Sequence, residues 1–129
     1  VDDLIAGVAD GIDTLDCAMP TRLARHGVAL VPDPAGRWRV DLVKGRWRRA
    51  HEPILEGCPC PACSAGFSRG YLHYLLRAHE LTGLRLVTLH NLSFMARVMA
   101  DLREAIEADR LDEVGDALLA GAAPTSCTC

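Results

Sequence analysis

Apolar residues recur every three or four positions in several parts of the chain, which is the spacing of one face of an α-helix. Asn91 and Ser68 are good N-caps for two of these stretches, and Gly83 could end the stretch that Ser68 begins. The pattern predicts helices over residues 2–9, 68 to about 81, a long stretch from Asn91, and 111–119. The residues expected to face the core are Leu4, Ile5, Val8, Leu72, Leu75, Leu76, His79, Leu92, Met95, Met99, Leu102 and Ile106.

Short apolar runs that are bounded by turn-forming residues predict extended structure. Residues 28–31 and 38–43 flank the turn sequence 32–36, which is rich in proline and glycine, so together they predict a β-hairpin. Residues 84–89 form another short β-like run. We expect this run to end at His90, which would then lie at a junction between a strand and a helix.

A further strand is predicted near the N-terminus. Residues 12–17 are apolar apart from Thr14 and two aspartates, and we interpret them as a buried strand with the carboxylates at or near its C-terminal end. Pro20 and Gly27 then mark a loop. The tail 122–129 has no periodic pattern, and we expect it to be loose.

The composition is that of a globular protein with one modest core. The chain has 129 residues, of which half are apolar and 24% are charged. No apolar run approaches the roughly 20 residues of a membrane span, and the acidic start of the chain is unlike a signal peptide. We therefore expect a cytoplasmic protein with no membrane partner. Because the first residue is not methionine, we expect the chain to be part of a longer protein.

Positive charge is concentrated in residues 22–49. The net charge of the chain is −3, but this window carries +6 and the rest of the chain carries −9. Such a window favours a docking surface for phosphate, although a solvated hairpin with scattered arginines is an equal alternative. The basic residues of the window are Arg22, Arg25, Arg37, Arg39, Lys44, Arg46, Arg48 and Arg49.

The strongest chemical signal is the spacing Cys58-x-Cys60-x-x-Cys63. Zinc prefers four thiolate or imidazole ligands in a tetrahedron, and one short knuckle supplies three of them without strain. His90 is our candidate for the fourth, so we expect one structural zinc ion with no open coordination position. The alternative is a set of free or disulfide-linked thiols with His90 simply in the core. His26, His51, His73 and His79 are weaker candidates, and Cys127 and Cys129 could add metal affinity or have no role.

The carboxylates near the end of the predicted strand 12–17 could act as nucleophiles. A carboxylate is ionised at neutral pH, because its reference pKa is about 4, and it can stabilise a cation-like anomeric carbon of a sugar. The alternative, which is more common for an isolated aspartate, is an N-cap or an ion pair. Arg22 and Arg25 follow directly, and their guanidinium groups suit phosphate and base edges, or are ordinary surface charge.

The order of several motifs resembles that of the bacterial-type tRNA-guanine transglycosylases, from near Val1 to about Ala120. The matching motifs are Gly11-Ile12-Asp13-x-x-Asp16-Cys17-x-x-Pro20-Thr21-Arg22-x-x-Arg25-x-Gly27, the three-cysteine knuckle, Ser68-Arg69-x-Tyr71-Leu72-His73, and His90-Asn91. The resemblance implies an α/β fold: the C-terminal part of a (β/α)8 TIM barrel with an inserted zinc-binding subdomain. It divides the chain into a catalytic segment (1–27), a hairpin and zinc subdomain (28–90), closing helices (91–121) and the tail.

The same resemblance assigns roles to individual residues. It implies that Asp16 is the covalent nucleophile, that Thr21, Arg22 and Arg25 contact the anticodon loop, and that Cys58, Cys60, Cys63 and His90 bind zinc. The reaction would exchange the wobble guanine of a tRNA with a GUN-type anticodon for a 7-deazaguanine base (preQ1 or queuine), in queuosine biosynthesis. Homodimers are expected in the full-length enzyme.

One departure from the family pattern is large. A complete barrel needs about 250 residues, and the base pocket and the general acid/base of the family lie in the N-terminal part that this chain lacks. We therefore expect the isolated chain to be inactive. Two alternatives remain open: a non-catalytic zinc- and RNA-binding module or partner subunit, and a structural zinc domain unrelated to RNA.

Overall fold

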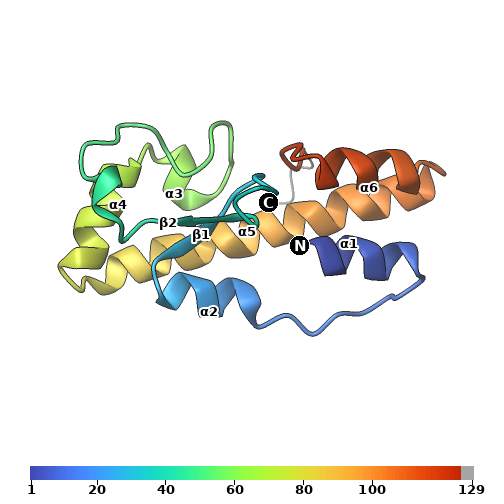
Figure 1. The fold of residues 1–129 in the computed structure, drawn as a ribbon, viewed down its shortest axis with the longest axis horizontal. Helices are drawn as coiled ribbons and strands as arrows, with labels where there is room; N and C mark the ends of the chain where they lie inside the picture. Colours follow the sequence, from blue (N-terminus) through green and yellow to red (C-terminus); the bar gives the residue numbers. More distant parts are fainter. Residues whose placement is uncertain (126–129) are drawn as a thin grey trace.

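The structure is organised around one long helix, α5 (Leu81–Glu107), which is about 40 Å long at 1.5 Å per residue. The computed structural model describes residues 1–125. Figure 1 shows the hairpin, α3 and α4 along the N-terminal half of α5, and α1 and α6 along its C-terminal half. The other elements are α1 (Asp2–Ala9), α2 (Met19–Arg25), β1 (Val28–Leu30), β2 (Arg39–Asp41), the 3-10 turn η1 (Gly45–Trp47), α3 (Pro61–Ser64), α4 (Arg69–Arg77) and α6 (Leu111–Leu119).

Two buried clusters of apolar side chains lie along α5. The first includes Leu42, Ile54 and Leu72, and it joins the hairpin to α4 and to the start of α5. The second includes Phe94 and Leu102 and joins α1, α5 and α6, with α6 in contact with both of the other helices. The hairpin also reaches the second cluster through Leu30 and Trp38, so it connects the two halves of the molecule.

Several predicted elements are confirmed. β1 and β2 form the antiparallel hairpin, with Leu30 opposite Arg39. Helices α1 and α6 lie where the periodicity predicts them. Ser68 is the N-cap of α4, and its hydroxyl accepts a hydrogen bond from the Tyr71 backbone N–H at 3.1 Å. None of the helices in residues 1–125 has the length and apolar character needed to cross a membrane.

The predicted strand 84–89 is wrong, because these residues belong to α5. Helix α4 ends at Arg77, and an exposed His79 with a positive φ of 57° redirects the chain into the next helix. Gly83 does not stop a helix. It is buried where α5 crosses α4, and a Cβ atom there would lie 2.9 Å from the Cβ of Leu75. Asn91 is likewise no N-cap but lies in the middle of α5, so the boundary predicted between residues 90 and 91 falls inside one helix.

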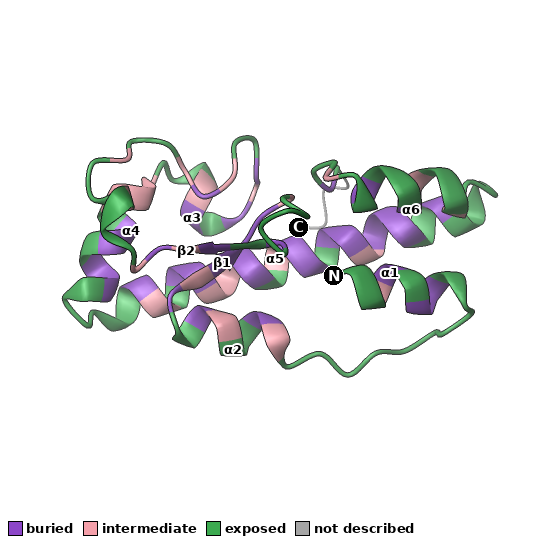
Figure 2. Cartoon of the chain, viewed as in Figure 1, coloured by how far each residue is buried: buried purple, intermediate pink, exposed green. Residues whose placement is uncertain are grey.

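The predicted buried strand 12–17 is also wrong. The segment has no secondary structure, and Ile12 and Leu15 are 47% and 38% exposed. Figure 2 shows it as part of an exposed connection between α1 and α2. A buried strand needs hydrogen-bonding neighbours, and within residues 1–125 the strands are confined to the β1–β2 hairpin. The predicted loop from Pro20 to Gly27 is mostly helix α2, because proline is tolerated in the first turn of a helix.

The described residues form a mostly helical α/β fold, and the parallel strands of a barrel are not among them. On the long helix, Met95 and Leu102 are buried as predicted, but Leu92 and Ile106 are exposed. The buried face of α5 instead includes His90, Asn91, Phe94 and Val98.

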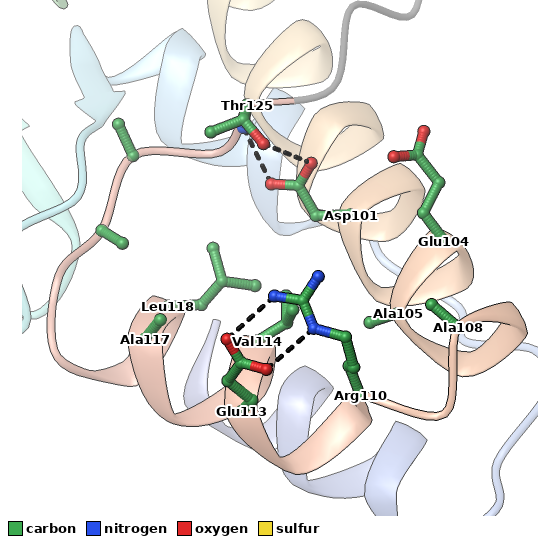
Figure 3. A pocket seen from close by; sticks show the side chains of 12 residues that line it. Asp101, Glu104, Ala105, Ala108, Arg110, Glu113, Val114, Ala117, Leu118 and Thr125 are labelled. Atoms are coloured by element: carbon green, nitrogen blue, oxygen red, sulfur yellow. Dashed lines mark hydrogen bonds and ion pairs between the residues drawn. The ribbon is translucent and has the colours of Figure 1, made fainter.

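The start of the C-terminal tail is held in place rather than loose. Pro124 is buried and its carbonyl accepts a hydrogen bond from Arg97, while the Thr125 N–H donates to Asp101 at 2.8 Å. Figure 3 shows the contact between Thr125 and Asp101 beside the cleft between α5 and α6, where Arg110 and Glu113 form an ion pair. Cys127 and Cys129 lie outside the described residues.

Candidate metal centre and Asp16 loop

Three sulfur atoms and one imidazole nitrogen converge between α3 and α5. The ligand atoms of Cys58, Cys60, Cys63 and His90 all lie within 4.8 Å of one another. His90 Nδ1 is 3.8, 3.4 and 3.6 Å from the three Sγ atoms in that order. A tetrahedral ion with Zn–S bonds of about 2.3 Å and a Zn–N bond of about 2.1 Å requires N···S separations of about 3.6 Å. The four donor atoms therefore fit one zinc ion, as predicted.

The local backbone explains how one short knuckle presents its sulfurs together. Cys60 is the N-cap of α3, and its Sγ accepts a hydrogen bond from the Cys63 N–H at 3.4 Å. Pro61 occupies the first helical position, where its missing N–H costs no hydrogen bond. The cap therefore holds the Cys60 sulfur beside the first turn of α3, which carries Cys63.

His90 is oriented by its second ring nitrogen. The side chain is fully buried, and Nε2 lies 2.8 Å from the Leu30 carbonyl oxygen of β1, to which it donates its proton. This hydrogen bond leaves Nδ1 as the atom that faces the sulfurs. The histidine ligand thus comes from the middle of a helix, not from the predicted junction between strand and helix.

The donor atoms share protons when no cation is bound. Burial lowers the pKa of His90, but hydrogen bonds to Cys58, Cys60 and Leu30 outweigh it and raise the pKa to about 9. Hydrogen bonds with Cys60 and Cys63 hold the pKa of Cys58 well below its usual range, whereas hydrogen bonds with Cys58 and Cys60 raise the pKa of Cys63. A metal ion would replace these shared protons. Because all four tetrahedral positions are taken by protein atoms, the ion would be structural.

Asp16 lies in the connection between α1 and α2, which we call the Asp16 loop (residues 12–18). Its side chain is exposed. Thr21, Arg22 and Arg25 are all exposed on α2, and Arg22 and Arg25 are three residues apart, so they share one side of the helix. The Thr21 hydroxyl donates a hydrogen bond to the Ala18 carbonyl oxygen at 3.1 Å, which fixes the end of the loop against α2.

The comparisons with known proteins agree with the motif order. The family model described as "Queuine tRNA-ribosyltransferase" matches residues 1–123. The chain belongs to this family. Proteins named queuine tRNA-ribosyltransferase from Roseiflexus sp. (strain RS-1) and Thiobacillus denitrificans are both 47% identical to it, over 106 and 111 residues, and cover 82% and 86% of this chain. That of Symbiobacterium thermophilum is 43% identical over 118 residues and covers 92%.

The chain is much shorter than these relatives. The matched regions make up 26%, 29% and 28% of the three relatives in the same order, so the chain spans between a quarter and a third of their length. The four-ligand cluster is consistent with the structural zinc of the queuine tRNA-ribosyltransferase family, which the resemblance implies.

The other histidines lie outside this metal cluster. His26, His51 and His79 are exposed. His73 is buried on α4, where its Nδ1 lies 2.8 Å from the Leu42 carbonyl oxygen and joins the helix to the residue after β2. His73 is therefore a packing residue rather than a ligand, while the prediction that His79 faces inward is wrong.

The basic window predicted from the sequence is open to solvent. All eight basic side chains of residues 22–49 are exposed, and the ion pairs recorded among residues 1–125 involve other arginines. Arg46 lies over the Trp47 ring, and so does Arg69, which lies outside the window in the sequence. Each guanidinium carbon is 4.7 Å from the ring centroid. Sequence patterns could not show that a tryptophan orders one of these arginines.

One polar residue of the site was misinterpreted at the sequence level. Asn91 is fully buried beside His90 and hydrogen-bonds to the backbone of β1 and α2. An asparagine side chain can cap a helix or bridge two buried backbone segments with the same amide group, so the residue type alone does not distinguish the two roles. The adjacent pair His90-Asn91 belongs to the family motif, but only the fold gives the asparagine a role.

Proposed function

We propose that this chain is the part of a tRNA-guanine transglycosylase that carries the nucleophile, the anticodon-loop contacts and the zinc scaffold. The observation that supports the proposal most strongly is the family match, which runs through residues 1–123 and includes both the Asp16 loop and all four metal ligands. The reaction is the exchange of the wobble guanine of a GUN-type anticodon for a 7-deazaguanine base.

In the proposed reaction, Asp16 forms a covalent bond to the ribose. Its carboxylate attacks C1′ of the wobble nucleoside, the bond to guanine N9 breaks, and its electron pair leaves with the guanine, which takes up a proton. The ring nitrogen of the incoming deazaguanine, after losing its proton, then attacks C1′ and releases the carboxylate. Two displacements retain the configuration at C1′. Exposure of Asp16 fits this role, because a nucleophile must reach a polymeric substrate.

The tRNA would be held by the basic face next to the loop. Arg22 and Arg25 follow Asp16 on α2, and guanidinium groups bind phosphates and base edges through paired N–H donors. The exposed basic residues of the window 22–49 would extend this contact along the RNA backbone. The affinity should therefore fall as salt is added.

The zinc ion would supply rigidity, not chemistry. It would hold the knuckle of Cys58, Cys60 and Cys63 to α5, and α5 in turn contacts α2. The base pocket, the general acid/base and the rest of the barrel would come from the N-terminal portion that the longer relatives have. The full-length enzyme would be a homodimer, and this chain by itself should not turn over.

A chimera tests the function directly. The chain would replace the matching portion of the Roseiflexus relative, to which it is 47% identical over 106 residues. We expect incorporation of labelled guanine into tRNA, and loss of at least about three orders of magnitude in rate with Asp16→Asn, as for removal of a nucleophile. Asp13→Asn is the matched control. An active Asp16→Asn chimera, or base exchange by the isolated chain, would contradict the proposal.

A non-catalytic role in RNA binding is the alternative. It is favoured by one observation, namely that no strand lies beside the Asp16 loop within residues 1–125 to hold the carboxylate rigid. If the chimera binds tRNA with normal affinity but never forms a covalent adduct, whether it carries the native Asp16 or the Asp16→Asn substitution, the chain is a binding module.

A further inference from the structure

We propose that Asn91 is a positioning residue, which fixes the start of α2, and with it the Asp16 loop, to the turn of α5 that carries the metal ligand His90. The inference rests on the proposed function for the meaning of that loop. It concerns a side chain that neither binds the metal nor faces the substrate.

The amide group of Asn91 is fully buried and fully used. Its Oδ1 accepts a hydrogen bond from the Leu30 N–H at 2.8 Å. Its Nδ2 donates to the carbonyl oxygens of Pro20 and Val28, both at 3.0 Å. A primary amide has two N–H donors, and both have a partner, so the orientation of the side chain is determined by the surrounding backbone.

These contacts complete one edge of the hairpin. β1 pairs with β2 on one side, through Ala29 opposite Val40. On its other side, the backbone groups of Val28 and Leu30 are bound by the side chains of His90 and Asn91. Two adjacent residues of α5 therefore take the place of a strand, and one of them is a metal ligand.

The hydrogen bond to Pro20 extends this arrangement to the Asp16 loop. Pro20 lies in the first turn of α2, four residues after Asp16 and one residue before Thr21. At its N-terminal end the loop is tied to α1 by the Ile12 N–H, which donates to the Gly7 carbonyl oxygen at 2.9 Å. At the C-terminal end, Asn91 supplies the corresponding anchor by its hydrogen bond to Pro20, although the two residues are 71 positions apart in the sequence.

Two adjacent residues in one turn of α5 therefore have different roles: His90 faces the metal site, and Asn91 binds the backbone of β1 and α2. His90 holds β1 to the metal site, and Asn91 holds both β1 and α2 to the same turn. Removal of the two Nδ2 donors should leave the metal site intact but free the start of α2. The Asp16 loop would then sample more positions, and the RNA-binding residues on α2 would lose their fixed placement.

The test compares Asn91→Asp with Thr88→Val in the zinc-loaded chain. Asn91→Asp retains the acceptor and the shape of the side chain but removes both donors, whereas Thr88→Val removes only a bond to the Leu84 carbonyl oxygen within α5. Both variants should retain one zinc ion per chain. With Asn91→Asp alone, we expect amide hydrogen exchange in residues 22–27, whose N–H groups are hydrogen-bonded within α2 and at its end, to rise at least about tenfold. Affinity for an anticodon stem–loop RNA should fall about tenfold.

A structural effect would look different. If exchange rises equally throughout α4, α5 and α6, or if residues 22–27 exchange at the wild-type rate, the positioning role is wrong. Should Asn91→Asp fail to retain zinc, Asn91→Ser serves instead, because the shorter hydroxyl cannot span to both α2 and β1. A folded, zinc-loaded Asn91→Ser chain with wild-type exchange in α2 would overturn the inference. If the wild-type chain binds no stem–loop, the proposed function fails, but the exchange measurement still decides the role of Asn91.

Discussion

The metal centre is buried and fixed by hydrogen bonds, whereas the Asp16 loop is exposed and has no regular structure. Around the metal centre, His90, Cys58 and Cys60 are buried, and hydrogen bonds from β1, α3 and α5 fix their orientations. The Asp16 loop has no regular structure, its side chains from residue 12 to residue 17 are exposed, and Ile12 and Leu15 face solvent in part.

The difference indicates which part of the site this chain can build by itself. The metal centre obtains its ligands, its hydrogen bonds and its apolar cover from residues 50–94 and from the hairpin. The Asp16 loop lacks strand neighbours among residues 1–125, and the relatives that share it are three to four times longer. The metal scaffold can therefore be complete while the loop that carries the proposed nucleophile still needs surfaces from elsewhere.

Loss of a metal ligand should have the largest effect. Cys60→Ser removes a thiolate that also caps α3, and zinc content should fall from one ion per chain to none. Because binding of a structural zinc contributes about 10–16 kcal/mol in zinc-finger peptides, we expect the free energy of unfolding to fall by more than about 4 kcal/mol. Elemental analysis and urea unfolding measure the two effects. Cys17→Ser, at an exposed position of the loop, is the control and should change neither.

Gly27→Ala should have the next largest effect, because it combines backbone strain with a clash. Gly27 has a φ of +71°, and a Cβ atom there would lie 2.5 Å from Cγ2 of Val43. We expect a loss of about 2–3 kcal/mol in unfolding free energy. Gly66→Ala isolates the strain, since Gly66 has a φ of +76° with nothing within 4 Å of the added atom. Equal losses for both variants would show that Gly27 is not tightly packed against Val43 and Leu76.

Ser68→Ala tests the local capping of α4. Its hydroxyl accepts the Tyr71 N–H, so its removal should lower the unfolding free energy by about 1 kcal/mol. The exposed Thr82, in the first turn of α5, gives a control in Thr82→Ala, for which we expect less than about 0.5 kcal/mol. If the two variants were equal in denaturant unfolding, the cap would contribute nothing.

The smallest effect is expected in the Asp16 loop. Leu15→Ser should lower the unfolding free energy of this chain by less than about 1 kcal/mol, because the side chain is 38% exposed and lies in a segment without regular structure. In the chimera with the longer relative, the same change should be clearly destabilising if the missing part covers Leu15. A large loss in the isolated chain would show that the loop is packed, and would remove the contrast with the metal centre.

Features that depend on neighbours along the chain could be predicted from the order of residues. Helices α1, α4 and α6 follow from periodicity, the hairpin from its turn residues, and the Ser68 cap from side-chain chemistry. The knuckle of Cys58, Cys60 and Cys63 was also evident, because close spacing alone brings three thiolates to one ion.

The other features depend on contacts between segments that are distant in the sequence. The run 84–89 is too short for its pattern to distinguish a strand from a segment of a helix, and the packing of Gly83 against Leu75 is that of one helix crossing another. The segment 12–17 has the composition of a strand but no partner within the described chain. Burial and hydrogen-bond partners are properties of residues far apart in sequence. For that reason neither the orientation of His90 nor the bridge from Asn91 to Pro20 could be derived from the order of amino acids.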